Sequence, residues 1–419
     1  MAQLSDDCFA FGGPLLPVDD ALAILAGRLG AVDGSEILAL AEVDGRVLAR
    51  DLVAPLPLPP FTNSAVDGYA LDGGVIPTDA GEAFVVAGRV QAGAAANVPA
   101  APRQTVRVFT GAPMPAGMDT AFMQEDVRVQ DDGSVILPPG LRRGANVRPA
   151  GEDVQAGQVV LEAGHRMRPQ DVALAAALGL THVEARRRIR VAVMSTGNEI
   201  VAPGAPRGPA QLFDSNRFML IAMLARLGCA VEDLGILADD RNATASMLAK
   251  AAAGNDLVLA SGGVSTGEAD FVRAAVESAG TLVFWRLGIK PGRPVAMGVI
   301  GGTTPFIGLP GNPVASFVTF VHVARPAILA LSGTPLRPPV AVPLRAAFSY
   351  RKKAGRREYV RASLRKAGDG AMEAVKFPRE GAGLLSSLVE TDGLVELREE
   401  TTSVEFGQTV AFLPYANLL

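Results

Sequence analysis

A glycine-rich loop that also carries acids is the part of this sequence best suited to chemistry. It runs from Ser261 to Asp270, directly after the apolar run 256–260 and directly before a segment with helical spacing, 271–278. The apolar run predicts a buried strand. A strand that breaks into glycines and then starts a helix exposes backbone N–H groups that suit a phosphate or another oxyanion. Glu268 and Asp270 suit a hard cation such as Mg²⁺. The loop therefore favours a site for a metal–oxyanion pair over a plain turn.

Four more polar loops follow predicted strands in the segment 188–332. Taken singly, each is explained about as well by a turn and a helix cap as by a function, and Asp240 and Asn312 fit capping particularly well. The alternation of strands and helices predicts a parallel sheet with helices on both faces. Ligands bind such sheets where the carboxyl ends of the strands run into loops, so five converging loops favour a binding site. The four loops are Ser195–Glu199, Asp239–Asp240, Arg286–Arg293 and Gly308–Pro313.

Charged residues of both signs would share this cleft. A hydrogen bond to a charged group is worth about 1.5–3 kcal/mol, whereas a helix N-terminus favours an anion by roughly 0.3–1 kcal/mol. Lys290 and its basic neighbours should therefore dominate anion affinity, and the glycine loops should set the geometry. Arg286 is the weakest of these cations because it could simply stack on Trp285. The acids are Glu199, Asp239 and Asp270, and the cations are Arg286, Lys290 and Arg293.

Size and composition limit the class of protein. The chain has 419 residues, 49% of them apolar and 20% charged, which predicts a soluble globular protein of two to four domains. The net charge of −4 gives no general attraction to nucleic acid or to an anionic membrane face. Cys8 and Cys229 lie far apart, which favours a reducing compartment without disulfides. No signal pattern and no membrane-spanning apolar run is expected. The sequence therefore predicts a cytoplasmic protein.

Changes of pattern along the chain predict four domains. A helix over Pro17–Gly30, capped by Asp19 or Asp20, and a helix over Pro169–Gly179 enclose a β-rich region with many turns. The tail beyond residue 335 has short strands and turns, which predict a small β domain or barrel. We therefore expect a discontinuous linking domain (14–54 plus 146–187), an inserted β-rich domain (55–145), a three-layer α/β domain with a parallel-rich sheet (188–334) and a C-terminal β-barrel-like domain (335–419).

Polar clusters outside the α/β segment have plainer explanations. Asn63, Ser64 and Asp67 crowd one turn ahead of a strand, and Asx-turn chemistry accounts for Asn63. The basic run 351–357 is more typical of a solvated hairpin tip than of a phosphate track. The three histidines share no catalytic or metal-binding spacing and are expected to be structural; they are His165, His182 and His322.

Together these motifs resemble the molybdopterin molybdenumtransferases, the MoeA family that includes the gephyrin E domain. The similar stretches occur in the family's order and cover nearly the whole chain, so jointly they are far more specific than the glycine loop alone. They are Phe61–Ala70, Thr110–Pro113, Gly151–Asp153, Ser195–Glu199, Gly262–Asp270, Ile289–Pro294 and Gly308–Pro313.

The resemblance implies an elongated four-domain subunit in a homodimer whose site is shared between subunits. It implies Mg²⁺-dependent insertion of molybdate into adenylylated molybdopterin with release of AMP, and transient contact with the molybdopterin adenylyltransferase. The positions that it implies for catalysis are Asp67, Thr110, Glu199, Asp270 and Lys290, the first two reaching in from the partner subunit. The implied metal ligands are Glu199, Asp239 and Asp270. The implied substrate-binding positions are Gly262, Gly263, Ser265, Gly267, Arg286, Arg293, Pro310, Asn312, Arg361 and one of Ser386 or Ser387.

Several positions depart from the family pattern. Asn198 stands where the family usually has Asp, and Thr266 where it usually has Val. Arg286 and Arg293 stand where lysine is common, which keeps the charge but changes a point donor to a fork. The reaction class is unaffected, whereas the choice between molybdate and tungstate is left open. Two further alternatives are a pterin-binding scaffold without turnover and a nucleotide transferase or hydrolase that uses the α/β unit alone.

Overall fold

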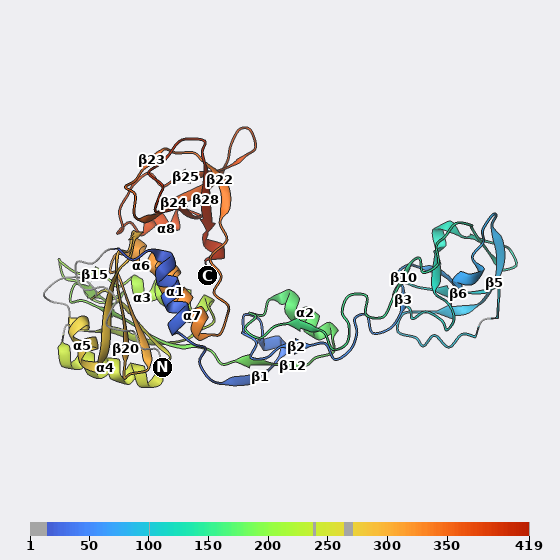
Figure 1. Cartoon of the computed structure of the whole chain (residues 1–419), viewed down its shortest axis with the longest axis horizontal. Helices are drawn as coiled ribbons and strands as arrows, with labels where there is room; N and C mark the ends of the chain where they lie inside the picture. Colours follow the sequence, from blue (N-terminus) through green and yellow to red (C-terminus); the bar gives the residue numbers. More distant parts are fainter. Residues whose placement is uncertain (1–14, 100, 238–239, 264–270, 419) are drawn as a thin grey trace.

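The computed structural model describes residues 15–99, 101–237, 240–263 and 271–418 and shows an elongated molecule (Figure 1). An α/β unit and a C-terminal barrel lie together at one end. A small unit with helix α2 (Pro169–Ala177) occupies the middle, and a β-rich unit forms the far end. The expected multidomain α/β plus β architecture is confirmed, while the exact domain boundaries stay predictions.

The α/β unit is built on a six-stranded sheet. Its four neighbouring strands β16, β13, β17 and β21 are all parallel, while β20 is antiparallel to both β21 and β18. The predicted parallel-rich sheet is therefore confirmed, although β20 was not among the predicted strands. In spatial order the strands are β16 (Ala230–Leu237), β13 (Arg190–Thr196), β17 (Leu257–Ser261), β21 (Thr304–Leu309), β20 (Pro294–Ile300) and β18 (Gly280–Arg286).

Helices cover both faces of this sheet, as predicted. Alternate side chains of β13 face opposite sides: Val191 and Val193 join one core cluster, and Ala192 and Met194 the other, because successive side chains of a strand point to opposite faces. The first cluster is covered by α1 (Val18–Arg28), α3 (Asn216–Arg226), α6 (Pro313–Thr319), the π-helical turn η4 (Phe320–Ala324) and α7 (Arg325–Leu331). The second is covered by α4 (Arg241–Gly254) and α5 (Phe271–Ala279).

Two sequence expectations about helices need correction. The first turn of α1 is preceded by Pro17 and has no side-chain cap, and Asp19 instead binds Arg357 in the barrel. The segment Pro313–Leu331 is long and apolar enough to cross a membrane by length and composition, contrary to the expectation that no such run exists. It is, however, 83% buried inside the structure, as expected for a central core helix.

The middle unit is built from two separate stretches of the chain, and the far unit is inserted between them. Strand β1 (Ser35–Ala39) pairs with β12 (His182–Arg186), and β2 (Leu52–Val53) pairs with β11 (Val159–Leu161). The intervening chain forms the β-rich unit, as the sequence suggested. Its six-stranded sheet has the order β7 (Thr120–Met123), β4 (Gly68–Leu71), β6 (Gln104–Val108), β5 (Glu82–Val90), β9 (Val135–Leu137) and β8 (Arg128–Val129), with β3 (Asn63–Ser64) paired to β10 (Val147–Arg148) beside it.

The C-terminal unit is a closed five-stranded barrel. Each barrel strand pairs with two others, so no barrel edge is left open. The short strand β19 (Ile289–Lys290) of the α/β unit pairs with β24 and places Lys290 opposite Glu358. The barrel strands are β22 (Val342–Ala346), β24 (Arg357–Lys366), β25 (Met372–Lys376), β26 (Gly393–Leu397) and β28 (Thr409–Pro414), and the short helix α8 is Ser386–Val389.

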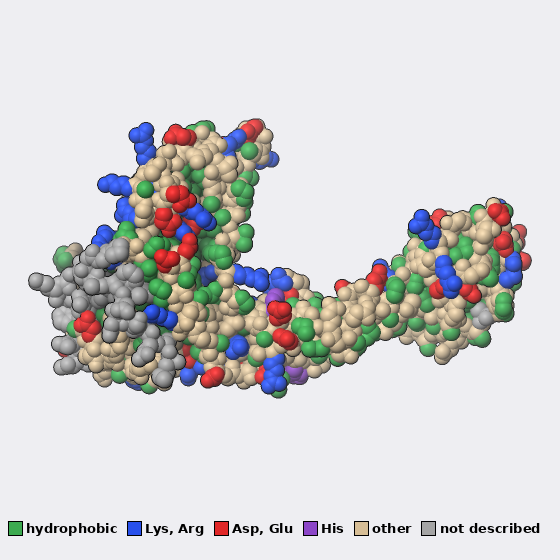
Figure 2. Space-filling model, in the orientation of Figure 1, with side chains coloured by type: hydrophobic (Ala, Val, Ile, Leu, Met, Phe, Trp, Pro, Cys, Tyr) green, Lys and Arg blue, Asp and Glu red, His purple; other side chains and the backbone are tan. Residues whose placement is uncertain are grey.

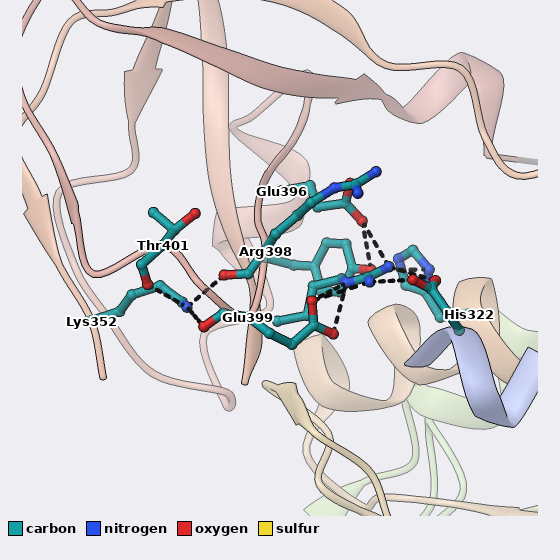
Figure 3. A network of polar contacts seen from close by, with 9 residues as sticks. His322, Lys352, Glu396, Arg398, Glu399 and Thr401 are labelled. Carbon is teal, nitrogen blue, oxygen red and sulfur yellow. Dashed lines mark hydrogen bonds and ion pairs between the residues drawn. The ribbon is translucent and has the colours of Figure 1, made fainter. Parts of the chain in front are cut away.

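Polar contacts fix the barrel against the helices of the α/β unit (Figure 3). Both terminal nitrogens of Arg357 donate to the Asp19 carboxylate, at 2.9 and 2.7 Å. The Tyr359 ring stacks on His322 with centroids 4.1 Å apart, and its hydroxyl donates to Glu396 at 3.1 Å. Because Arg357 is buried, these charge-assisted bonds restrict how the barrel can move relative to Lys290 on the neighbouring strand.

Candidate active site

The polar loops predicted from the sequence leave the sheet at one edge. Strands β16, β13, β17 and β21 are parallel, and β18 runs in the same direction because β20 is antiparallel to both of its neighbours. Their carboxyl ends therefore lie along one edge, where ligands bind in open α/β sheets. Four predicted site residues, Asp239, Ser265, Gly267 and Asp270, lie outside the described residues.

A cavity of about 350 Å³ opens at this edge, and we call it the sheet-edge cavity. Thr196 and Glu199 line it from the loop after β13, Gly262 from the loop after β17, and Asn312 from the loop after β21. Glu199 is exposed. Asp214 also lines the cavity, but its carboxylate already accepts bonds from Ser195 Oγ at 3.0 Å and Arg217 Nε at 2.8 Å.

The glycine loop meets the cavity at a position that only glycine fits. Gly262 has a φ of +85°, and a Cβ there would lie 2.8 Å from the carbonyl oxygen of Thr196. Both the left-handed backbone and the close approach exclude a side chain. Gly263 also has a positive φ, of +64°. The loop can therefore bring backbone groups, rather than side chains, toward a ligand.

A second cavity, of about 450 Å³, lies between the α/β unit and the barrel, and we call it the cationic cavity. Asn312 lines both cavities, so the two adjoin. The predicted residues Lys290, Pro310 and Arg361 line it. Its charged lining consists of five cations and one carboxylate, namely Lys290, Arg356, Arg361, Lys376, Arg379 and Glu380.

Three of those cations were missed by sequence reasoning. Arg356 belongs to the basic run interpreted as a solvated hairpin tip; it lies half-buried in the turn before β24, as that interpretation has it, and it also lines this cavity. Lys376 and Arg379 have no local signal, because only closure of the barrel brings the end of β25 next to Lys290. Such long-range placement cannot be read from spacing along the chain.

Lys290 is held by two barrel residues. Its ammonium donates to Glu358 Oε2 at 3.0 Å and to the Tyr350 hydroxyl at 3.3 Å, and Tyr350 donates to the same Glu358 oxygen at 2.9 Å. Burial works against the charged form, but the bond to Glu358 and the neighbouring Tyr350 outweigh it, so the pKa of Lys290 is raised. Lys290 is thus a fixed cation at neutral pH, with 45% of its side chain exposed.

Arg361 and Ser387 form a second fixed donor group. Arg361 Nε donates to Ser387 Oγ at 3.1 Å, and its Nη2 donates to the carbonyl of Gly381 at 3.2 Å. Burial lowers the pKa of Arg361, although arginine remains charged at any ordinary pH. Ser387 is buried whereas Ser386 is exposed. Of the two serines, it is therefore Ser387 that contacts this arginine.

Other predicted positions are not gathered here. The described residues that line these two cavities do not include Arg286 or Arg293. Asp67 accepts bonds from the backbone N–H and the hydroxyl of Thr110, both at 2.8 Å, and these bonds lower the pKa of Asp67. The two residues therefore meet each other, but in the β-rich unit at the far end of the molecule (Figure 1).

The predicted helix caps and metal ligands differ in what their side chains contact. Asp240 caps α4 through a bond from Ala243 N at 2.7 Å, as predicted. Asn312 stands at the N-cap of α6 without a side-chain cap bond and lines both cavities instead. Within the described ranges, no three His, Cys, Asp or Glu side chains gather to hold a metal. Glu199 is the one described member of the predicted metal set, and its exposed carboxylate is a type of ligand that Mg²⁺ accepts.

Comparisons with known proteins agree with this architecture. Three family models match the chain: the MoeA N-terminal region (domain I and II) over residues 16–179, a probable molybdopterin binding domain over 192–330, and the MoeA C-terminal region (domain IV) over 343–415. A structure titled as the molybdopterin biosynthesis MoeA protein of Pyrococcus horikoshii OT3 is similar with a TM-score of 0.81 and 28% identity, covering 96% of this chain and 100% of that one. The fold is that of a multidomain protein with a molybdopterin-binding type of α/β domain.

Curated relatives make the assignment more specific. The Molybdopterin molybdenumtransferase of Haemophilus influenzae is 36% identical over 409 residues, which is 97% of this chain and 100% of the relative. The Molybdopterin molybdenumtransferase 2 of Mycobacterium tuberculosis is 35% identical over 88% of this chain and 92% of the relative. The chain belongs to the molybdopterin molybdenumtransferase family, a family of transferase enzymes.

Proposed function

We propose that this protein inserts molybdenum, supplied as molybdate, into adenylylated molybdopterin and releases AMP in a Mg²⁺-dependent reaction. The observation that carries the proposal is the pair of adjoining cavities at the carboxyl edge of the sheet, of which one is strongly cationic. The names of its relatives, which place them in molybdenum transfer to molybdopterin, support the same reaction.

The cationic cavity is assigned to the oxyanions. The whole chain carries a net charge of −4, so an anion gains attraction only where cations are concentrated locally. Arg361 and Lys290 each offer N–H donors from a side chain that is already held in place. Each charge-assisted bond is worth about 1.5–3 kcal/mol, so two of them correspond to dissociation constants of roughly tens of micromolar to several millimolar for a tetrahedral dianion. Pro310 and Asn312 shape the boundary with the sheet-edge cavity.

The chemical step consumes one water, breaks the phosphoanhydride of the adenylylated substrate, and leaves AMP and the molybdopterin phosphate. Glu199, together with Asp239 and Asp270, would hold Mg²⁺, which supplies polarisation of the phosphate oxygens. Lys290 and the backbone N–H groups of the glycine loop would stabilise the negative charge that develops at phosphorus. The two dithiolene thiols of the pterin then replace one oxygen of molybdate: two Mo–S bonds form, one Mo–O bond breaks, and that oxygen leaves with the two thiol protons as water, which offsets the water consumed. No covalent intermediate on a protein side chain is required.

A homodimer would complete the site. Asp67 and Thr110 lie at the end of the molecule away from both cavities, so in a dimer they would reach the site of the second subunit. Acidic and basic side chains are interspersed on the face drawn in Figure 2, so this face offers no continuous basic surface to nucleic acid or to an anionic membrane. The cytoplasmic location is part of the proposal. Transient contact with the molybdopterin adenylyltransferase would supply the substrate.

The test is anaerobic incubation of the purified protein with adenylylated molybdopterin, molybdate and Mg²⁺. We expect AMP and molybdenum cofactor to form together, and chelation of Mg²⁺ to stop both. Binding of the pterin without AMP release would instead indicate a scaffold. Parallel reactions with tungstate measure which oxyanion the cationic cavity selects.

A further inference from the structure

An arginine of the β-rich unit lies near the Asp67–Thr110 pair without a carboxylate of its own. Arg107 is on β6, directly opposite Tyr69 of β4, and it is half-buried. Its hydrogen bonds go to neutral groups: Nη1 donates to the Tyr69 hydroxyl at 2.8 Å, and Nη2 donates to the side-chain oxygen of Gln124. A cation that has lost part of its hydration is normally paired with an opposite charge. Among the residues that the structure describes, no carboxylate forms an ion pair with Arg107.

Other arginines show what this arrangement means. Arg103 and Arg143 belong to the same β-rich unit, and each forms an ion pair with a carboxylate, which neutralises its charge locally. Arg361 of the cationic cavity is instead held by a serine hydroxyl and a backbone carbonyl. Arg107 is held in the second way, so its side chain is fixed while its charge is left for an anion from outside the unit.

Two aromatic rings and two hydrogen bonds hold the Arg107 guanidinium in place. Its central carbon lies 4.9 Å from the centroid of the Tyr69 ring and 5.4 Å from that of Phe109, and each such contact contributes roughly 0.5–1 kcal/mol. Arginine has five N–H donors. One goes to Tyr69, one goes to Gln124, and the Nε donor is buried and out of reach of a ligand. The remaining N–H groups, on the two terminal nitrogens, are the ones that an anion would use.

Arg107 and the Asp67–Thr110 pair lie at the same end of the β-rich sheet. Gln124, which accepts from Arg107, donates its backbone N–H to the Asp67 carbonyl at 2.9 Å. Phe109, which contacts the guanidinium, directly precedes Thr110. The bonds from Thr110 lower the pKa of Asp67, and the nearby charge of Arg107 adds to this effect. A fixed cation and a fixed carboxylate therefore share one end of this unit, away from both cavities (Figure 1).

We propose that Arg107 binds a phosphate of the adenylylated substrate in the site of the second subunit. The planar fork of an arginine matches the oxygens of a phosphate, and the cation offsets the repulsion that Asp67 alone would exert on the same group. Molybdate is assigned to the cationic cavity of the other subunit, so the phosphate is the anion left for Arg107. This inference rests on the proposed function, including its homodimer, and adds a substrate-binding residue to it.

The first test is the steady-state rate of AMP release by Arg107→Gln, measured against the concentration of each substrate. The KM for adenylylated molybdopterin should rise about ten- to a hundredfold, the range for one lost charge-assisted bond, while the KM for molybdate stays the same. Arg107→Lys keeps the charge and should recover most of the affinity. Two controls should keep the wild-type KM: Arg103→Gln, which removes a paired arginine of the same unit, and Tyr69→Phe, which removes one bond to Arg107 and should only lower the melting temperature.

The second test uses mixed dimers, purified through a different affinity tag on each subunit. In a dimer of Arg107→Gln with Lys290→Met, one of the two shared sites contains neither substitution, so AMP release should return. In a dimer of Arg107→Gln with Asp67→Asn, each site contains one substitution, so AMP release should stay low.

Three results would overturn the inference while AMP release by the wild type keeps the proposed function. They are a wild-type KM in Arg107→Gln, an equal rise of the KM in Tyr69→Phe, and no return of AMP release in the dimer of Arg107→Gln with Lys290→Met. A wild-type protein that releases no AMP from adenylylated molybdopterin overturns both the inference and the proposed function.

Discussion

Replacing Lys290 by methionine should separate its part in the fold from its part in anion binding. The substitution removes the ammonium and leaves the Glu358 carboxylate, which is 3% exposed, with the Tyr350 hydroxyl as its remaining side-chain donor in the part of the chain that the structure describes. Breaking a fully buried pair costs about 3–5 kcal/mol. Lys290 is 45% exposed, so solvent screening should reduce the loss to roughly 1–2 kcal/mol. The lost charge-assisted bond should weaken molybdate binding about ten- to a hundredfold.

The double variant Lys290→Met/Glu358→Gln distinguishes the two effects. A neutral amide at position 358 can still accept the Tyr350 hydroxyl and no longer leaves a buried charge unpaired, so stability should recover. Molybdate affinity should stay low, because the cation is still missing. Calorimetric titration with sodium molybdate and thermal unfolding measure the two quantities, with exposed Lys366→Met on the same barrel strand as the control. Recovery of both stability and affinity in the double variant would refute a direct contact between Lys290 and the anion.

Three further predictions concern other parts of the molecule. Ser387→Ala should leave a buried arginine N–H unpaired and weaken molybdate binding, whereas the exposed Ser386→Ala should not; equal titrations of the two variants would contradict this. Asp171→Asn should cost about 1–3 kcal/mol of unfolding free energy at pH 7. Hydrogen bonds, chiefly from Arg168, lower the pKa of Asp171 in the folded protein. The ionised carboxylate therefore stabilises the fold above the ordinary carboxyl pKa, and this stabilisation is lost as the pH falls toward the lowered value. In denaturant titrations below about pH 4, the difference in unfolding free energy between wild type and Asp171→Asn should shrink. Finally, Asp67→Asn and Lys290→Met proteins should each be inactive. Mixed dimers of the two should regain AMP release, because one of their two shared sites contains neither substitution. Inactive mixed dimers would indicate that the site lies within one subunit.

Local patterns were enough to predict the framework of the α/β unit. The spacing of Val18, Leu22 and Leu25 predicted α1, and the structure places these residues against the first core cluster. The alternation of strands and helices similarly predicted the parallel sheet, because a parallel connection needs a crossover segment. In these elements the sequence signal is local and agrees with the tertiary packing.

The remainder depends on contacts that have no local signature. Strand β20 is defined by pairing with β18 and β21. Asp19 sits where a helix cap is expected, yet the barrel cation Arg357 draws its carboxylate away. For the same reason Lys376 was not predicted as a site residue, since it reaches the cationic cavity only when the barrel closes. Asn216 likewise lines the sheet-edge cavity from the first turn of α3, where no local pattern marks it as a site residue.

The central claim is that one site holds the oxyanion in the cationic cavity and the pterin in the sheet-edge cavity. Anomalous diffraction at the molybdenum edge, from crystals grown with molybdate and adenylylated molybdopterin, tests it most directly. We predict a molybdenum peak between Lys290 and Arg361, with pterin density in the adjoining sheet-edge cavity. A molybdenum peak away from both cavities, or pterin density elsewhere on the chain, would contradict the account.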